Sequence, residues 1–320
     1  MATESVAANP DIGSSDGAAP VEDSVVCIGV FDGVHMGHQA LIARGRELAD
    51  ELGCAVVVIT FNPHPGRVLR PEGAPAELGS LADRIAWIKE AGADEVLVMP
   101  FTPALAATTP EEFVRLALRT QTHARAVVVG DNFSFGAGAT GNVDTLRELG
   151  ARMGFTAESL MVADGAENIS STRIRGLLRD EGDVAGAARL LGRPYLIRGI
   201  VVHGDARGRN LGYPTANLAW SADLVVPADG VYAGWLLARG ERLPAAISVG
   251  TNPQFDGQEH RIEAYVIDRD DLDLYGQRVG IEFGHWLRAQ ETYPSTEAFV
   301  AQMGRDVDAT RALVEGAAHG

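Results

Sequence analysis

The chain has 320 residues, of which 46% are hydrophobic, so it can bury one large core or two ordinary ones, and two domains are the better expectation. Its net charge of −16 would repel a nucleic-acid backbone, and it contains no long run of lysine or arginine. No stretch of about 18 apolar residues is present to span a bilayer. Residues 1–21, rich in Ala, Ser, Gly and Asp, lack the pattern of a signal peptide and predict a disordered tail. We therefore expect neither a nucleic-acid partner nor a membrane span.

Cysteine and lysine are both rare in the chain. Cys27 and Cys54 lie in Val/Ile-rich runs, where buried packing is the favoured interpretation, so we expect a reduced, cytoplasmic protein. Lys89 is the only lysine, and no Gly-rich loop ends in Gly-Lys-Ser/Thr, which excludes a P-loop NTPase. A bound phosphate would therefore need arginine, histidine, backbone N–H groups or a metal.

From about residue 25 to 182, apolar strands alternate with amphipathic helices. The predicted strands are SVVCIGVF, CAVVVITF, DEVLVMPF and ARAVVVG, and a helical pattern follows each of them. This alternation indicates a parallel sheet covered on both faces, which binds ligands at the carboxyl ends of its strands. The segments FDGVHMGH, NPHP and GDNFSFG follow three of the predicted strands. We expect an α/β domain over residues 22–191 with its site at that edge.

The second half has a different rhythm. Short strand candidates broken by Gly, Pro and Asp follow one another without helices: YLIRGIVVHG, DLVVPADGVYAGWLLARG, LPAAISVG, HRIEAYVID and RVGIEFGHWL. Such spacing predicts an antiparallel barrel or sandwich. A helix from about residue 296 to 315, with Phe299, Met303, Val307 and Leu313 on a helical repeat, would close it. We place this domain at residues 192–320.

The segment FDGVHMGH puts His35 and His38 one helical turn apart at the start of a helix. Glycines there let phosphates approach the backbone, and the unpaired N–H groups and imidazoles can donate to them. The pattern favours stabilisation of a reacting α-phosphate. Capping or solvated histidines are the alternative, and a zinc site with His64 as third ligand is weaker because no acidic or thiolate partner is evident.

Three further features suit phosphate chemistry. In ISSTRIR, Arg173 and Arg175 follow helix-capping residues, where positive charge opposes the helix dipole unless an anion binds; a plain cap is the alternative. In GYPTANL, Thr215 and Asn217 would share one face of an extended segment and could hold Mg²⁺ with ATP phosphates, although a turn before a strand explains the pattern too. Glu263 is a carboxylate in an otherwise apolar alternating strand, so it is either a general base or an ordinary surface residue. Periodicity does not indicate whether its side chain faces the interior or the solvent.

FDGVHMGHQ, TFNPHP, VGDNFSFG and ISSTRIR, in this order, resemble the nucleotidyltransferase half of the prokaryotic bifunctional riboflavin kinase/FMN adenylyltransferases, the FAD synthetases. GRNLGYPTANL, PADGVYAGW, ISVGTNP, IEAYVID and DLYG resemble the riboflavin kinase half. The resemblance implies a Rossmann-like domain followed by a β-barrel with a C-terminal helix. It further implies that riboflavin is phosphorylated to FMN and FMN adenylylated to FAD, with ATP and Mg²⁺, and that Glu263 is the base on riboflavin.

The resemblance also assigns binding residues. Those of the adenylyltransferase, beside His35 and His38, are Gly29, Phe31, Asp32, Gly33, Phe61, Asn62, Pro63, Asn132, Ser171, Thr172 and Arg175. Those of the kinase are Gly204, Arg207, Gly208, Arg209, Pro214, Thr215, Asn217 and Arg288.

The chain departs from the family pattern at Ser134, Asn168, Gln290 and Tyr293. Two alternatives therefore stay open: a protein with only the kinase half active, and a flavin-binding carrier or sensor without turnover. The sequence does not indicate the oligomeric state.

Overall fold

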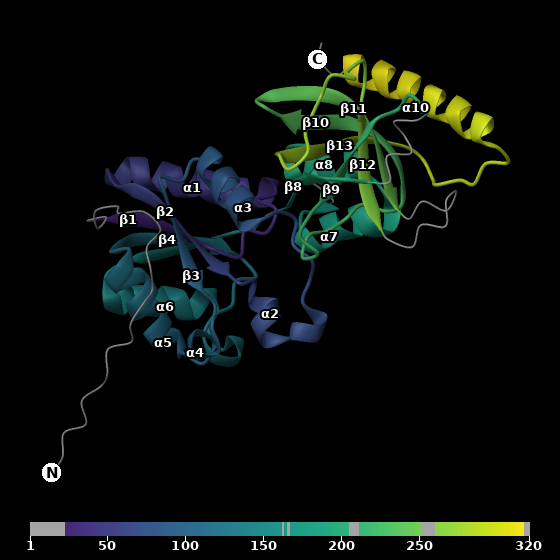
Figure 1. Ribbon diagram of the computed structural model, residues 1–320. Helices are drawn as coiled ribbons and strands as arrows, with labels where there is room; N and C mark the ends of the chain where they lie inside the picture. Colours follow the sequence, from purple (N-terminus) through teal and green to yellow (C-terminus); the bar gives the residue numbers. More distant parts are fainter. Residues whose placement is uncertain (1–22, 162, 165–166, 205–210, 251–259, 317–320) are drawn as a thin grey trace. The chain divides into compact units, whose positions relative to one another are not determined.

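The computed structural model describes residues 23–161, 163–164, 167–204, 211–250 and 260–316 (Figure 1). The predicted disordered tail lies outside these residues. The chain divides into two compact units, one of Met1–Pro75 with Leu81–Ala163 and one of Ala76–Ser80 with Asp164–Gly320. A domain limit between residues 191 and 192 stays a prediction, because a compact unit is not the same as a segment that folds alone.

The first unit is built on a five-stranded parallel sheet, as predicted. Its strand order is β3-β2-β1-β4-β5. The strands are β1 (Ser24–Ile28), β2 (Ala55–Asn62), β3 (Glu95–Pro100), β4 (Ala124–Gly130) and β5 (Thr156–Leu160). Val26 of β1 lies beside Val57 and Val127 of its neighbours, and all three are at most 3% exposed, as expected for a sheet covered on both faces.

The chain extends the sheet from β1 to β2 and β3, and then returns to add β4 on the other side of β1. This reversal makes the carboxyl ends of β1 and β4 the expected ligand-binding edge. The helical segments of this unit are α1 (Met36–Leu52), α2 (Pro65–Leu69), η1 (Pro71–Gly73), α3 (Leu81–Glu90), α4 (Pro103–Ala106), α5 (Pro110–Phe113), η2 (Val114–Gln121), η3 (Ala137–Ala139) and α6 (Val143–Met153).

The second unit contains a closed antiparallel barrel, which confirms the barrel alternative over the sandwich. Its strand order is β10-β11-β12-β9-β8-β13. The strands are β8 (Tyr195–Val202), β9 (Thr215–Ala219), β10 (Gly230–Ala238), β11 (Glu241–Gly250), β12 (Arg261–Val266) and β13 (Arg278–Arg288). The other elements that complete the chain are β6 (Ala163–Asp164), β7 (Glu167–Asn168), α7 (Ser171–Gly176), η4 (Leu177–Glu181), α8 (Val184–Leu191) and α10 (Thr296–Gly316).

The C-terminal helix α10 confirms the predicted helix and packs on β10, β11 and β13. One residue of the predicted repeat behaves differently: Leu313 is 37% exposed, whereas Val314 next to it is 5% exposed. The buried stripe of the helix is therefore offset from the expected one near its end.

A short piece of the first half of the sequence belongs to the barrel unit. The N–H of Glu77 donates to the carbonyl of Asp223 (2.7 Å), and the N–H of Val225 donates to the carbonyl of Glu77 (2.9 Å). Glu77 thereby forms an isolated parallel β-bridge with Leu224. Sequence periodicity gave no sign of this pairing, because it joins segments about 150 residues apart in the chain.

None of the helices in the described part of the chain combines the length and the hydropathy that a bilayer crossing needs.

Candidate active sites

In the first unit, a strained turn connects β1 to α1. Phe31, Gly33 and Val34 all have a positive φ, at 53°, 76° and 40°. This conformation is costly for a β-branched valine, and tight packing has to hold it. Phe31 and Val34 are fully buried, and the N–H of Val34 donates to the carbonyl of Phe31 (3.1 Å). The buried side chains therefore fix the backbone that leads into the two histidines.

His35 and His38 stack at the beginning of α1. His35 is the N-cap, and its Nδ1 accepts a hydrogen bond from the N–H of His38 at 3.3 Å. The two rings lie 3.7 Å apart and nearly parallel. Accepting at Nδ1 leaves the proton of a neutral His35 on Nε2. The capping role that the sequence left open is thus real for His35, and it also brings the two rings together.

The environment of His38 favours its neutral form. Burial lowers the pKa of His38 well below its ordinary value, and the nearby positive charges of His35 and Arg84 lower that pKa further. Its Nδ1 is buried without a hydrogen-bond partner in the structure. A neutral imidazole whose buried nitrogen has no hydrogen-bond partner in the described residues is unusual for a purely structural residue, which makes His38 a candidate ligand-binding group.

Arg84 is a charged residue near this site that sequence analysis missed. Its side chain is fully buried in α3, and Nη1 donates to the carbonyl of Phe61 at 2.9 Å, at the carboxyl end of β2. The pattern held a signal: Arg84 falls on the apolar face of the predicted helix, one turn before Ile88, where an uncharged residue is expected.

The other predicted residues of this half gather at the carboxyl edge of the sheet. Gly29, Asp32 and Gly33 follow β1, with Asp32 buried, and a Cβ on Gly29 would meet the Phe31 ring at 3.2 Å. The residues that end or follow β2 and β4 are Phe61, which is buried, and Asn62, Pro63 and Asn132, which are exposed.

The zinc alternative is not supported. Nδ1 of His64 accepts a hydrogen bond from the N–H of Gly66 (3.0 Å) and so caps α2. In the described ranges, no group of three or more His, Cys, Asp or Glu side chains is arranged to hold a metal ion.

The ISSTRIR segment forms α7, which belongs to the second unit and is described with it. Ser170 caps the helix by accepting from the N–H of Arg173. Arg173 pairs with Glu181 at 2.5 Å, and Nε of Arg175 donates to the carbonyl of Ala76 at 2.6 Å. The capping prediction is confirmed. The carboxylate of Glu181 balances the positive charge of Arg173. Ser171 and Thr172 occupy the first turn.

The residues predicted for the kinase site meet on neighbouring strands of the barrel. Glu263 of β12 lies across from Asn217 of β9, and the Thr215 hydroxyl donates to Oε2 of Glu263 in a long hydrogen bond of 3.4 Å. Thr215 and Asn217 thus share a face, as predicted. Gly204 lies so close to Asn217 that a Cβ there would be 2.4 Å from the amide nitrogen. Pro214 directly precedes β9, whereas Arg207, Gly208 and Arg209 lie outside the described residues.

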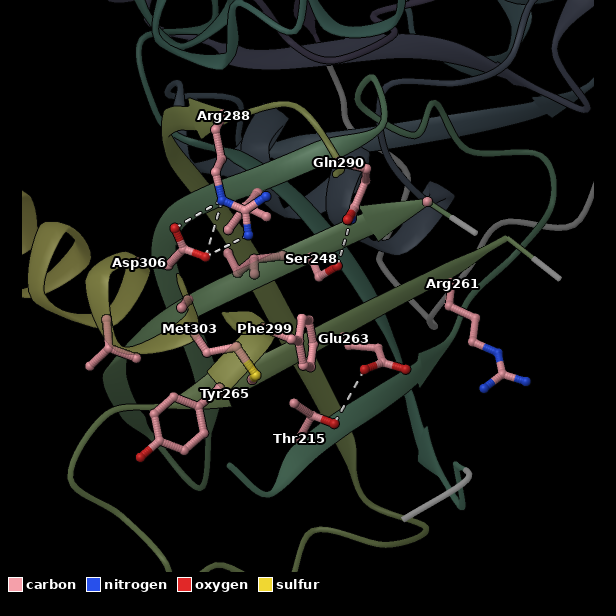
Figure 2. Close-up of a pocket in the computed structure, with 15 residues that line it drawn as sticks. Thr215, Ser248, Arg261, Glu263, Tyr265, Arg288, Gln290, Phe299, Met303 and Asp306 are labelled. Atoms are coloured by element: carbon pink, nitrogen blue, oxygen red, sulfur yellow. Dashed lines mark hydrogen bonds and ion pairs between the residues drawn. The ribbon is translucent and has the colours of Figure 1, made fainter. Parts of the chain in front are cut away.

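The structure answers which face Glu263 occupies. Ile262 and Ala264 are at most 1% exposed and fill the barrel interior, so Glu263 points outward. Its side chain is half-buried, because it lines a pocket between this outer face and α10 (Figure 2). The pocket is lined by Thr215, Val231, Ala246, Ile247, Ser248, Gly250, Arg261, Glu263, Tyr265, Arg288, Gln290, Phe299, Met303, Asp306 and Val307.

Several pocket residues were missed or undervalued by sequence analysis. Arg288 was predicted, but its partner Asp306 was not, although Asp306 interrupts the apolar repeat of the final helix. Gln290, a departure from the family pattern, donates from Nε2 to the Ser248 hydroxyl (2.8 Å) and the Val249 carbonyl (3.1 Å). Phe299 and Met303 were expected to pack on the barrel, and they also line the pocket.

These two units define a class of enzyme with one candidate site at a parallel-sheet edge and a second candidate site on a β-barrel. The FAD synthetase family matches residues 18–173, and the riboflavin kinase family matches residues 191–314. Matches to both halves do not favour the single-activity alternative.

Curated relatives cover nearly the whole chain. The bifunctional riboflavin kinase/FMN adenylyltransferase of Escherichia coli (strain K12) is 37% identical over 90% of this chain and 92% of its own. The proteins of the same name from Pseudomonas fluorescens and Bacillus subtilis (strain 168) are 39% and 35% identical, over 92% and 88% of this chain and 94% and 90% of their own. The chain belongs to the bifunctional riboflavin kinase/FMN adenylyltransferase family.

A solved structure shares the fold. A crystal structure from Streptococcus pneumoniae superposes with a TM-score of 0.82 at 34% identity, over 92% of this chain and 95% of that chain. That protein is described as a macrolide-efflux protein, and the description applies to the pneumococcal protein alone.

Proposed function

We propose that this chain makes FMN from riboflavin and ATP at the barrel pocket, and makes FAD from FMN and a second ATP at the sheet edge, with release of pyrophosphate. One observation carries the proposal: Glu263 and Thr215 meet at 3.4 Å in the lining of a pocket whose other wall is apolar. Such a pocket suits a flat, apolar ring with a hydroxylated chain.

In the kinase reaction, Glu263 would take the proton from the terminal hydroxyl of riboflavin as that oxygen attacks the γ-phosphate of ATP. The Thr215 hydroxyl, hydrogen-bonded to Oε2, orients the carboxylate. The absence of a side chain at Gly204 lets the backbone approach Asn217 closely. Around this centre we place Pro214 and Arg288, and the undescribed Arg207, Gly208 and Arg209, as ATP-binding and flavin-binding residues.

The donors of this site also fit a magnesium ion. The Thr215 hydroxyl and the Asn217 amide oxygen are hard oxygen ligands on one face of β9, with the Glu263 carboxylate opposite Asn217. We propose that Thr215 and Asn217 hold Mg²⁺ together with ATP phosphates. When bound, the ion supplies positive charge that neutralises the phosphates during transfer.

In the adenylyl transfer, His35 and His38 would donate hydrogen bonds to the ATP phosphates while the FMN phosphate attacks the α-phosphate. Imidazoles held in place by a buried turn need no rearrangement as charge develops, which is how positioned donors lower a barrier. Gly29, Phe31, Asp32 and Gly33 shape the turn. We further propose Phe61, Asn62 and Pro63 as the flavin side of this site, and Asn132, Ser171, Thr172 and Arg175 as ATP and FMN contacts.

A cytoplasmic location also remains a proposal. Both cysteines are free, and burial raises the pKa of Cys27 to about 12, so its thiol stays protonated and unreactive. ATP, which both reactions consume, is a further reason to expect this compartment.

The direct test is to incubate the purified protein with riboflavin, ATP and Mg²⁺ and to separate the flavins over time. We expect FMN to appear first and FAD to follow. If the protein binds flavin but leaves ATP untouched, the carrier alternative is correct.

A further inference from the structure

A partly buried ion pair joins helix α10 to the barrel wall. Nε of Arg288, at the end of β13, donates to Oδ1 of Asp306 at 3.0 Å, and Nη2 donates to Oδ2 at 2.7 Å. The two side chains are 18% and 9% exposed. Figure 2 shows the pair on the side of the pocket away from Thr215 and Glu263. A two-pronged pair of this kind fixes both the distance and the orientation of its partners.

Protein groups occupy all three guanidinium nitrogens of Arg288. Besides the bonds from Nε and Nη2 to Asp306, Nη1 donates to the carbonyl of Ala289 at 2.9 Å. Asp306 accepts a further hydrogen bond from Nε2 of Gln302 at 2.8 Å. These hydrogen bonds of Arg288 are directed at α10 and at its own backbone, so Arg288 places the helix in addition to lining the pocket.

The placement of α10 matters because the helix forms one wall of the pocket. Phe299, Met303 and Val307 are spaced by four residues and line the pocket together with Asp306. Asp306 thus lies on the same face as the apolar side chains. A shift of the helix at Asp306 would move that apolar wall relative to Glu263 on the barrel.

The rest of the helix has its own attachment. Thr310 and Val314, further along α10, are 0% and 5% exposed. Loss of the ion pair should therefore loosen the first half of α10, which carries Phe299 and Met303, while the second half stays packed. A variant that loses the ion pair can therefore misplace the apolar wall of the pocket while α10 as a whole stays folded.

We propose that Asp306 is a positioning residue for riboflavin: its ion pair with Arg288 fixes α10 on the barrel and thereby fixes the apolar wall that receives the flavin ring. The inference rests on the proposed kinase function. Asp306 itself is not proposed to touch the reacting atoms.

The test compares Asp306→Asn with Asp308→Asn in the full chain. Asp308 is a matched control, because it lies on the same helix and pairs with Arg311 at 3.2 Å, but its side chain is 78% exposed. For Asp306→Asn we expect a riboflavin KM raised about tenfold or more, with kcat within about threefold of wild type, the signature of lost binding and not of lost chemistry. FAD formation from supplied FMN should be unchanged, and Asp308→Asn should behave as wild type in both reactions.

A second variant separates the position of the carboxylate at residue 306 from its negative charge. Asp306→Glu keeps the negative charge but adds one methylene, so its melting temperature should stay near wild type while the riboflavin KM still rises by about threefold or more. This variant also replaces Asp306→Asn if the latter does not fold. A wild-type KM in Asp306→Glu, or an equal loss of both activities in Asp306→Asn, overturns the inference. Wild-type protein that does not phosphorylate riboflavin would contradict the proposed function instead.

Discussion

The two candidate sites are assembled in opposite ways. At the sheet edge, one turn of ten residues, Gly29–His38, supplies the strained backbone, the helix N-terminus and both histidines. At the barrel, Thr215, Glu263 and Asp306 come from β9, β12 and α10, so the site exists only when distant segments pack correctly. The first site therefore depends on local conformation and the second on tertiary structure.

The two sites also differ in charge. The imidazole of His38 is kept neutral by burial and by nearby positive groups. Glu263 instead lies beside a hydroxyl and an amide on an outer face of the barrel. The first arrangement suits donors that hold phosphates, and the second suits a base that removes a proton. Substitutions in one site should therefore leave the other reaction intact.

The largest expected effect is on the kinase. Glu263→Gln keeps the shape but cannot accept a proton, so riboflavin phosphorylation should fall by about 10²–10⁴-fold, with riboflavin binding little changed. Supplied FMN should still become FAD. Kinetics of both half-reactions measure this, with Glu241→Gln on exposed β11 surface as the control. Normal turnover by Glu263→Gln would remove Glu263 from the mechanism.

The corresponding change at the sheet edge is His38→Ala. Loss of one positioned donor should lower kcat for FAD formation by about 10²-fold or more, while FMN formation stays near normal. His123→Asn is a suitable control, because His123 is exposed before β4 and its φ of 47° is one that asparagine tolerates. An equal loss of both activities in His38→Ala would indicate a structural histidine.

The neutral state of His38 also predicts a pH dependence of stability. The folded state lowers the pKa of His38, so the unfolded chain binds the proton first as the pH falls below about 6.5. The free energy of unfolding should then decrease by up to about 1.4 kcal/mol per pH unit until the folded pKa is reached. Urea unfolding of wild type and His38→Gln between pH 7.5 and 5.5 measures this contribution. Identical pH profiles for the two proteins would contradict it.

The smallest expected effect concerns the domain limit. A fragment of residues 192–320 should still convert riboflavin to FMN and make no FAD. Compared with a fragment starting at residue 164, it lacks the hydrogen bond from the Ala228 N–H to the Leu178 carbonyl (2.8 Å) and helix α8, which packs on β13, so its melting temperature should be a few degrees lower. A folded but inactive 192–320 fragment would show that the kinase site needs residues from the first half.

The sequence predicted local features well. Strand and helix periods indicated the parallel sheet, the barrel strands and α10, because side-chain burial repeats along each element. The proximity of His35 to His38, and the shared face of Thr215 and Asn217, were predictable because each pair lies within a few residues of sequence.

Partners across elements could not be predicted. Arg84 meets Phe61, and Asp306 meets Arg288, only after separate elements pack. The face of Glu263 could not be assigned from the sequence, because neither face of β12 is plain solvent surface. One face packs in the barrel interior, and the other lines the pocket. The pairing of Glu77 with residues 223–225 has no periodic signal at all.

The most direct measurement of two independent sites in one chain is complementation between single variants. Glu263→Gln and His38→Ala are each incubated with riboflavin, ATP and Mg²⁺, then mixed in equal amounts, and the flavins are separated over time. Our account predicts almost no product from Glu263→Gln, accumulation of FMN from His38→Ala, and recovery of FAD in the mixture, because FMN released by one variant is adenylylated by the other. Absence of FAD from the mixture, although Glu263→Gln converts supplied FMN, would contradict independent sites.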